Sequence, residues 1–169
     1  YDMFKKVKKG KKTMKKIKKL VAIQPVSFLE ESKPLLNDYC DEVVFYDTQP
    51  ESAEEIVSRI GDADAIFVSY THAIGGDILS ECPNLKYIGM CCSLYSEASS
   101  NVDIAYAREH GIVVTGIRDY GDEGVAEYVL MNSIRRLHGA DGYQPLLGDI
   151  SEVSGAKVGL LGLGASAQA

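Results

Sequence analysis

Residues 158–169 read VGLLGLGASAQA, a short apolar run that passes directly into a glycine-containing turn. The apolar run predicts a buried strand over Lys157–Gly162, because it is short and apolar on both faces. The turn Gly162-Leu-Gly164-Ala-Ser-Ala167 that follows has the spacing of a dinucleotide-binding turn. The sequence therefore predicts the opening of a nucleotide-binding unit, although a glycine-rich turn in another kind of α/β protein remains the alternative.

Each small residue of this turn has a physical role in dinucleotide binding. The first glycine permits a tight bend, the second lets the backbone approach a pyrophosphate, and a small third residue lets a helix pack on the strand. The amides at the start of that helix then bind the phosphates. The candidate cofactor-binding residues are Gly162, Gly164, Ala165, Ser166 and Ala167. The acid that would bind the ribose, about 20 residues further on, is expected beyond Ala169.

Composition indicates a globular protein with one domain and part of another. The 169 residues are 46% hydrophobic and 25% charged, as in folded soluble domains. No apolar run approaches the roughly 18 residues that span a bilayer, which argues against a membrane protein. The basic N-terminus lacks the apolar stretch and cleavage site of a secretory signal.

Charge is distributed unevenly. Residues 1–19 hold ten lysines and one aspartate, a net charge of +9. The formal net charge of the whole chain is −6, so residues 20–169 carry a net charge of −15. An acidic body repels phosphate backbones, and we therefore expect no nucleic-acid partner. We expect the leader 1–19 to be disordered or an added extension ahead of a natural start at Met14, because its lysines repel one another. Contact with polyanions or membrane surfaces is the alternative for this leader.

The cysteines and histidines show no metal-binding spacing. Cys40, Cys82, Cys91 and Cys92 form no C-x-x-C pair, and the histidines at 72, 110 and 138 are scattered. We therefore expect no metal, and reduced thiols in a cytoplasmic protein. The pair Cys91-Cys92 is expected to be structural, as no partner base lies nearby in the sequence. His72 follows a strand end, where lining a cleft is an alternative to a structural role.

Short apolar runs alternate with amphipathic segments along residues 20–117. Strands are predicted at 20–24, 42–46, 65–69, 86–90 and 112–115. Helices are predicted around 27–39 (irregular because of its prolines), at 52–60 with a Ser52–Glu55 capping box and a stop at Gly61, and at 101–110. Strand–helix alternation with short loops predicts a parallel sheet of flavodoxin-like type.

A longer helix is predicted over residues 122–138. Acids at its start and Arg135-Arg136 near its end suit the helix dipole. We expect a set of apolar residues at helical spacing to face inward: Val125, Ala126, Val129, Leu130, Ile134 and Leu137. The predicted organisation is therefore a leader at 1–19, a flavodoxin-like domain at 20–117, a linking helix and hinge at 118–154, and the start of a Rossmann domain at 155–169.

Four stretches in this order resemble the D-isomer-specific 2-hydroxyacid dehydrogenase family. They are Pro83-Asn-Leu-Lys-Tyr-Ile-Gly89, Asn101-Val-Asp103 with His110-Gly-Ile-Val-Val114, Val125-Ala-Glu127, and Val158-Gly-Leu-Leu-Gly-Leu-Gly164. The resemblance implies a flavodoxin-like substrate domain and an NAD-binding Rossmann domain, usually in a homodimer. It implies interconversion of 2-keto acids and D-2-hydroxy acids. The catalytic arginine, glutamate and histidine of the family lie downstream of the glycine turn, so the resemblance implies no catalytic residue within this chain and no activity for the chain alone.

The resemblance also suggests residues on the substrate side. The family holds the substrate carboxylate with backbone amides of a loop after the strand that corresponds to 86–90. The corresponding segment here, Cys91–Ser96, lacks glycine and is longer, and Cys92, Ser93 and Leu94 are its candidates. Tyr120 aligns with a tyrosine near the substrate, where a phenol can donate a hydrogen bond; capping the long helix is the alternative.

Two other functions are alternatives to this one. A non-catalytic flavodoxin-like binding or dimerisation module would use the long helix 122–138 for assembly. A phosphoacceptor receiver is disfavoured because Gln24-Pro25-Val26 stands where its acidic cluster would follow the first strand. The acids Asp62 and Asp64 precede a strand, whereas parallel sheets bind ligands beyond the carboxyl ends of their strands, so a solvated turn is expected there.

Overall fold

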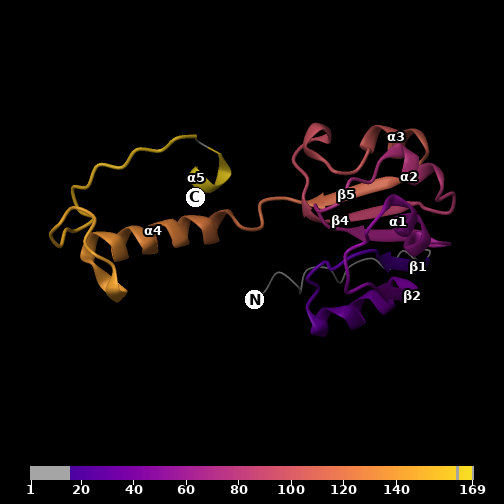
Figure 1. The fold of residues 1–169 in the computed structure, drawn as a ribbon, viewed down its shortest axis with the longest axis horizontal. Helices are drawn as coiled ribbons and strands as arrows, with labels where there is room; N and C mark the ends of the chain where they lie inside the picture. Colours follow the sequence, from indigo (N-terminus) through magenta and orange to yellow (C-terminus); the bar gives the residue numbers. More distant parts are fainter. Residues whose placement is uncertain (1–15, 163, 169) are drawn as a thin grey trace, which may run out of the picture. The chain divides into compact units, whose positions relative to one another are not determined.

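A computed structural model describes residues 16–162 and 164–168 (Figure 1). The chain divides into two compact units, Tyr1–Arg118 and Asp119–Ala169, and each is described by itself. Most of the predicted leader lies outside the described residues. Its last part does not match the expectation of disorder, because Ile17 to Lys19 belong to the first strand.

The first unit is built on a five-stranded, wholly parallel sheet, which confirms the predicted α/β class. The strand order is β2-β1-β3-β4-β5, the order of flavodoxin-like folds. The strands are β1 (Ile17–Ala22), β2 (Cys40–Phe45), β3 (Ala65–Val68), β4 (Tyr87–Ser93) and β5 (Val113–Ile117). Strand β1 lies between β2 and β3. The chain passes from β1 to β2 on one side of β1 and then crosses to β3 on the other side. The loops after β1 and β3 therefore flank the point where the winding of the sheet reverses.

Helices cover the sheet unequally. The larger core cluster packs strand residues such as Val21 and Ile66 against α1 (Ala53–Ile60), α2 (Gly76–Ser80) and α3 (Ile104–Glu109). A smaller cluster of Leu20, Cys40 and Ala65 lies with η2 (Glu30–Asp38), which is the indigo helix beside β2 in Figure 1. A short η3 (Glu97–Ser99) precedes α3. Alternate residues of the strands therefore supply two separate cores.

Helix α1 begins and ends where its sequence signals predict. The Ser52 hydroxyl accepts a 3.2 Å hydrogen bond from the Glu55 amide, and Gly61 ends the helix with φ +53°. The predicted capping box differs in one respect. The Glu55 carboxylate accepts from the amide of Glu51 at 2.7 Å instead of from that of Ser52. It still satisfies a free amide ahead of the first turn.

Two predicted helices differ from the structure. The segment around 27–39 is a 3-10 helix over Glu30–Asp38 that contains Pro34, because proline removes an amide and disfavours α-helical pairing. Helix α3 begins at Ile104 instead of residue 101, since Asp103 caps it by accepting a 2.9 Å bond from the Tyr106 amide. The side chain of Asn101 is engaged elsewhere, in the loop that carries His72.

The second unit contains α4 (Asp122–His138), η4 (Ala140–Gly142) and α5 (Ala165–Gln168). Helix α4 has the predicted bounds and ends at Gly139, whose φ is +65°. Its apolar residues do not face inward within the described chain, which corrects the prediction: Val125 is 50%, Val129 55% and Leu130 55% exposed. The helical spacing is present, but most of this face is exposed, and only Ala126 and Leu137 of the predicted set are half-buried.

The predicted strand at Lys157–Gly162 is not formed. This segment is extended and unpaired, and Val158, Leu160 and Leu161 are exposed. A strand requires a neighbouring strand for its backbone hydrogen bonds, and no described residue pairs with this segment. None of the helices in the described residues combines the length and the apolar character needed to cross a bilayer.

Candidate functional site

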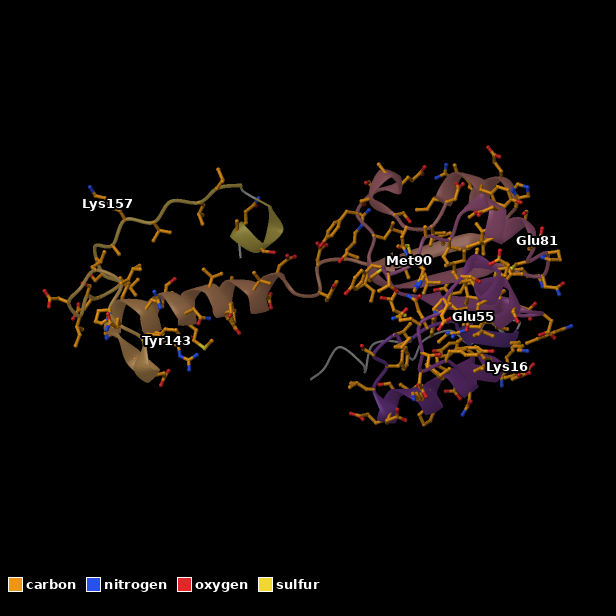
Figure 2. All side chains as sticks on the ribbon, in the orientation of Figure 1. Lys16, Glu55, Glu81, Met90, Tyr143 and Lys157 are labelled. Atoms are coloured by element: carbon orange, nitrogen blue, oxygen red, sulfur yellow. The ribbon has the colours of Figure 1, made fainter. Side chains whose placement is uncertain are left out.

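The carboxyl edge of the sheet, where the loops after β1, β3 and β4 meet, is the candidate substrate site. Parallel α/β sheets bind ligands beyond this edge, at the point where the winding reverses. Here β1 lies between β2 and β3, so Gln24 after β1 and His72 after β3 both belong to this edge. Met90, labelled in Figure 2, pairs with Val68 where β3 ends, which places the loop after β3 beside the last part of β4.

Gln24 and His72 form a direct contact at this edge. The Gln24 Oε1 lies 2.8 Å from His72 Nδ1, and the Thr71 hydroxyl lies 3.1 Å from the same nitrogen. Gln24 is 1% exposed, and its Nε2 has no hydrogen-bond partner in the described part of the chain. An unpartnered buried donor costs about 1–3 kcal/mol. The sequence did not predict this pair, because the two residues lie 48 positions apart.

Two further side chains hold the loops of this edge. The Asn101 amide donates to the carbonyls of Ser69 at 2.8 Å and His72 at 2.6 Å. It thereby connects the segment before α3 to the loop after β3. Arg59, 8% exposed, donates to the carbonyls of Ile23 and Thr48 at the ends of β1 and β2. Its guanidinium also pairs with Glu55 at 2.6 Å, which is labelled on α1 in Figure 2.

The predicted carboxylate-binding segment is partly strand. Cys92 and Ser93 belong to β4, which extends to Ser93 with a register shift between Gly89 and Ser93. The Leu94 amide donates to the Ile117 carbonyl at 3.1 Å. In this conformation the Leu94 amide is not available to a ligand, which corrects its prediction as a backbone donor. Cys92 and Ser93 lie in β4 beside β5, and their role as substrate contacts stays a prediction.

The end of β4 after its register shift, called here the bulged end, is held against the end of β5 by two contacts. The sequence did not predict either of them. Arg118 donates to the carbonyls of Leu94 at 2.7 Å and Tyr95 at 2.8 Å. Gly116 allows close packing, since a Cβ there would lie 2.3 Å from the Leu94 Cβ. Both contacts join residues more than 20 positions apart, and no local pattern indicates them.

The candidate cofactor turn and Tyr120 lie in the second unit. Gly162 has φ +96°, and helix α5 starts just after Gly164. A Cβ built at either glycine would have nothing within 4 Å, so the backbone is open to a close approach, as a pyrophosphate requires. This arrangement fits a dinucleotide turn, although the strand before it is not paired. The Ser166 hydroxyl donates to Asp122 of α4 at 2.6 Å.

Ala165, Ala167 and Tyr120 are the remaining turn and substrate candidates. Ala165 opens α5, the Ala167 amide donates to the Gly164 carbonyl at 3.0 Å, and Tyr120 is 67% exposed. The structure thus brings Cys92 and Ser93 to the same sheet edge as Gln24 and His72.

The cysteines are poorly suited to nucleophilic chemistry. All four are free thiols. Burial, with a smaller contribution from Cys92, raises the pKa of the Cys91 thiol to about 11. Burial also raises the pKa of Cys92. Among residues 16–162 and 164–168, no three histidine, cysteine or acidic side chains lie close enough to hold a metal ion.

The fold and the glycine turn together define a class: an α/β protein with a flavodoxin-like domain followed by the first turn of a dinucleotide-binding unit. Comparison with known proteins gives the family. The family model of the D-isomer specific 2-hydroxyacid dehydrogenase catalytic domain matches residues 16–169, and the chain belongs to this family. The match covers residues 16–169 and therefore does not depend on the pairing of the Lys157–Gly162 segment.

Named relatives agree with this assignment. The chain is 31% identical to a glyoxylate reductase of Thermofilum pendens over 80% of the chain and 43% of the relative. It is 26% identical to a hydroxypyruvate reductase of Blautia hydrogenotrophica over 76% of the chain and 43% of the relative. An NAD+-bound 3-phosphoglycerate dehydrogenase of Entamoeba histolytica superposes with a TM-score of 0.54 at 25% identity, covering 73% of this chain and 40% of that one. The chain thus spans less than half the length of these relatives.

Proposed function

We propose that this chain forms the substrate domain and the first cofactor-binding turn of an NAD-dependent oxidoreductase that interconverts 2-keto acids and D-2-hydroxy acids. The observation that carries the proposal is the family match, which covers the residues from β1 to the glycine turn. The names of the relatives, glyoxylate and hydroxypyruvate reductases, support a small 2-keto acid as substrate. The four free cysteines support a cytoplasmic location.

The residues of this chain have binding roles in the proposed reaction. Bound NAD(H) supplies or accepts the hydride. The open backbone at Gly162 and Gly164 would hold its pyrophosphate. The amides of Cys92 and Ser93 are the proposed contacts to the substrate carboxylate, and Arg118 holds the segment that follows them. We propose Tyr120 as a further substrate contact, because a phenol can donate to a carboxylate.

Catalysis is proposed to need residues outside this chain. In the family the arginine, glutamate and histidine follow the glycine turn, and no residue up to Ala169 takes their roles. The 169-residue chain assayed with glyoxylate and NADH should therefore show no turnover above background. The full-length gene product should turn over both glyoxylate and hydroxypyruvate. Absence of activity in the full-length product would overturn the proposed function.

The glycine turn provides a specific test of cofactor binding. Gly164→Val in the full-length gene product should raise the KM for NADH at least about tenfold, because a branched side chain would block the backbone approach. Gly159→Val is the matched control, because it adds the same side chain outside the turn Gly162–Ala167. Equal KM values for the two variants would remove the turn from the proposal.

A second candidate function is assembly through α4, as a homodimer or as a non-catalytic module. It is favoured by the exposed apolar face of Val125, Val129, Leu130 and Ile134, because such a face is usually covered by a partner. Sedimentation equilibrium should give twice the chain mass of 18.4 kDa. Leu130→Glu should return the protein to a monomer, whereas Glu123→Gln on the same helix should not. A monomeric parent protein would exclude this assembly.

A further inference from the structure

The segment that directly follows β4 contains one backbone amide without a partner. The Leu94 amide donates to the Ile117 carbonyl at 3.1 Å, and the Ser96 amide donates to the Ser99 hydroxyl at 3.1 Å. Between them, the Tyr95 amide has no hydrogen-bond partner in the described part of the chain. Tyr95 is 56% exposed, so a ligand can reach this part of the segment. The free donor therefore lies one residue beyond the last donor that the sequence predicts.

Arg118 determines the direction in which this amide points. Its Nε donates to the Leu94 carbonyl at 2.7 Å, and its Nη2 donates to the Tyr95 carbonyl at 2.8 Å. The Leu94 carbonyl and the Tyr95 amide belong to one planar trans peptide, in which C=O and N–H point in opposite directions. Because the carbonyl is held by the guanidinium at the end of β5, the Tyr95 N–H points away from β5. A carbonyl bonded to a cation also polarises its peptide, which makes the N–H a stronger donor.

Stabilisation of the fold alone does not explain this use of an arginine. Arg59, which is 8% exposed, bonds the Ile23 carbonyl in a place that water reaches poorly. Arg118 and Tyr95 are both exposed, and water there would satisfy the same carbonyls nearly as well. What a planar guanidinium supplies, and water does not, is a fixed orientation of two consecutive peptides.

We propose that Arg118 is a positioning residue that holds the Tyr95 amide in the orientation to donate to the carboxylate of the substrate. This inference rests on the proposed function and adds one donor, and the residue that orients it, to its binding site. The segment Cys91–Ser96 has no glycine, so its conformation is imposed by a side chain from the neighbouring strand β5 (Figure 1). A carboxylate at the proposed contacts Cys92 and Ser93 would meet its next donor at Tyr95.

Donation by the Tyr95 amide can be measured without an activity assay. Oxamate, a 2-keto acid analogue that is not reduced, is titrated into the 169-residue chain and followed by nitrogen–proton correlation NMR. The Tyr95 amide proton should move downfield and saturate, because a carboxylate deshields a proton that it accepts, whereas the bonded Leu94 amide should not move. Arg118→Met should abolish the shift. Arg135→Met, which removes an arginine paired with Asp141, should retain it. A parent chain in which the Tyr95 amide does not move would overturn the inference.

Kinetics of the full-length gene product separate a positioning role from a structural one. Arg118→Met should raise the KM for glyoxylate about tenfold, the effect of one lost hydrogen bond to a charged group, with kcat changed by less than about twofold. The KM for NADH should stay within about twofold of the parent value. A merely structural role would instead lower the active fraction of the enzyme, and therefore kcat, at an unchanged KM for glyoxylate.

Arg118→Lys separates positioning from direct attraction between the side chain and the substrate. Lysine keeps the positive charge but cannot bond two carbonyls as a planar fork does, so its KM for glyoxylate should stay close to that of Arg118→Met. A lysine variant with the parent KM, or a loss of kcat alone in Arg118→Met, would overturn the inference while the proposed function stands. Failure of the parent protein to reduce glyoxylate would overturn the proposed function itself.

Discussion

The guanidinium of Arg59 donates a 2.7 Å hydrogen bond to the carbonyl of Ile23, the residue immediately before Gln24. The same side chain donates to the Thr48 carbonyl and hydroxyl, and it lies 4.5 Å from the centroid of the Tyr46 ring. A single charged group on α1 thus connects the ends of β1 and β2. The position of Gln24, and through it that of His72, depends on this connection.

Removal of the Arg59 guanidinium should destabilise the first unit substantially. Arg59→Met keeps the apolar stem but leaves the carbonyls of Ile23 and Thr48 without their donor and Glu55 without its ion pair. Loss of about 2–4 kcal/mol in the free energy of unfolding is expected. Urea denaturation followed by circular dichroism measures it.

Arg108→Met is the matched control for Arg59→Met. Arg108 pairs with Glu97, but both side chains are more than half exposed, so a change within about 0.5 kcal/mol is expected. If both variants lose a similar amount of unfolding free energy, burial of the Arg59 hydrogen bonds contributes little to stability.

Local sequence signals predicted those elements that local interactions determine. The capping residue Ser52 and the stop at Gly61 defined α1, and the charged ends of residues 122–138 defined α4. The strands were found from their apolar runs, with ends shifted by a few residues. These features depend on neighbours within one or two turns of the chain.

The parts that were missed depend on contacts between distant residues. The Lys157–Gly162 run has the composition of a strand, but its hydrogen bonds require a neighbouring strand that no described residue provides. The Gln24–His72 contact and the Arg118–Leu94 bond join residues from different loops. A polar residue at the end of an apolar strand, as at Gln24, is the one signal that could have marked this edge.

Asp64 should make the stability of the first unit pH-dependent. A hydrogen bond from the Lys86 ammonium lowers the pKa of its carboxyl group, and the backbone amides of Lys18 and Lys19 also donate to it. Because the folded pKa lies below the unfolded value, this stabilisation is present above about pH 4 and is lost as the pH falls through the folded pKa. Asp64→Asn should cost about 1–2 kcal/mol at pH 7, and the difference from the parent protein should shrink below pH 4.

Asp62→Asn is the control for this prediction. The Asp62 carboxyl pairs with Lys19 at 2.7 Å, but its side chain is 76% exposed, so solvent screens the interaction. Thermal unfolding of both variants at pH 7 and pH 3 should show a much smaller effect for Asp62→Asn at pH 7. If Asp64→Asn lowers stability as much at pH 3 as at pH 7, the ionised Asp64 carboxylate is not the source of the stabilisation.

Cys91 should be nearly inert to alkylation in the folded protein. Its pKa of about 11 leaves roughly 0.1% of the thiol ionised at pH 8, against about a quarter for a thiol of ordinary pKa. Iodoacetamide labelling followed by peptide mass spectrometry should therefore be at least about 100-fold slower than in 8 M urea. Rapid labelling of folded Cys91 would indicate that the end of β4 opens readily.

Gly116 should be required for the close approach between β5 and the bulged end of β4. An added Cβ would lie 2.3 Å from the Leu94 Cβ and 3.4 Å from the Cys92 carbonyl oxygen, so one strand must move. Gly116→Ala should lower the free energy of unfolding by about 1–3 kcal/mol and weaken the bonds from Arg118 to Leu94 and Tyr95. Gly124→Ala, on α4 with nothing within 4 Å of its Cβ, should instead stabilise its helix by about 0.5–1 kcal/mol. Urea unfolding distinguishes the two, and a Gly116→Ala protein as stable as the parent would show that the β4 bulge adjusts without cost and does not hold Cys92 and Ser93 in place.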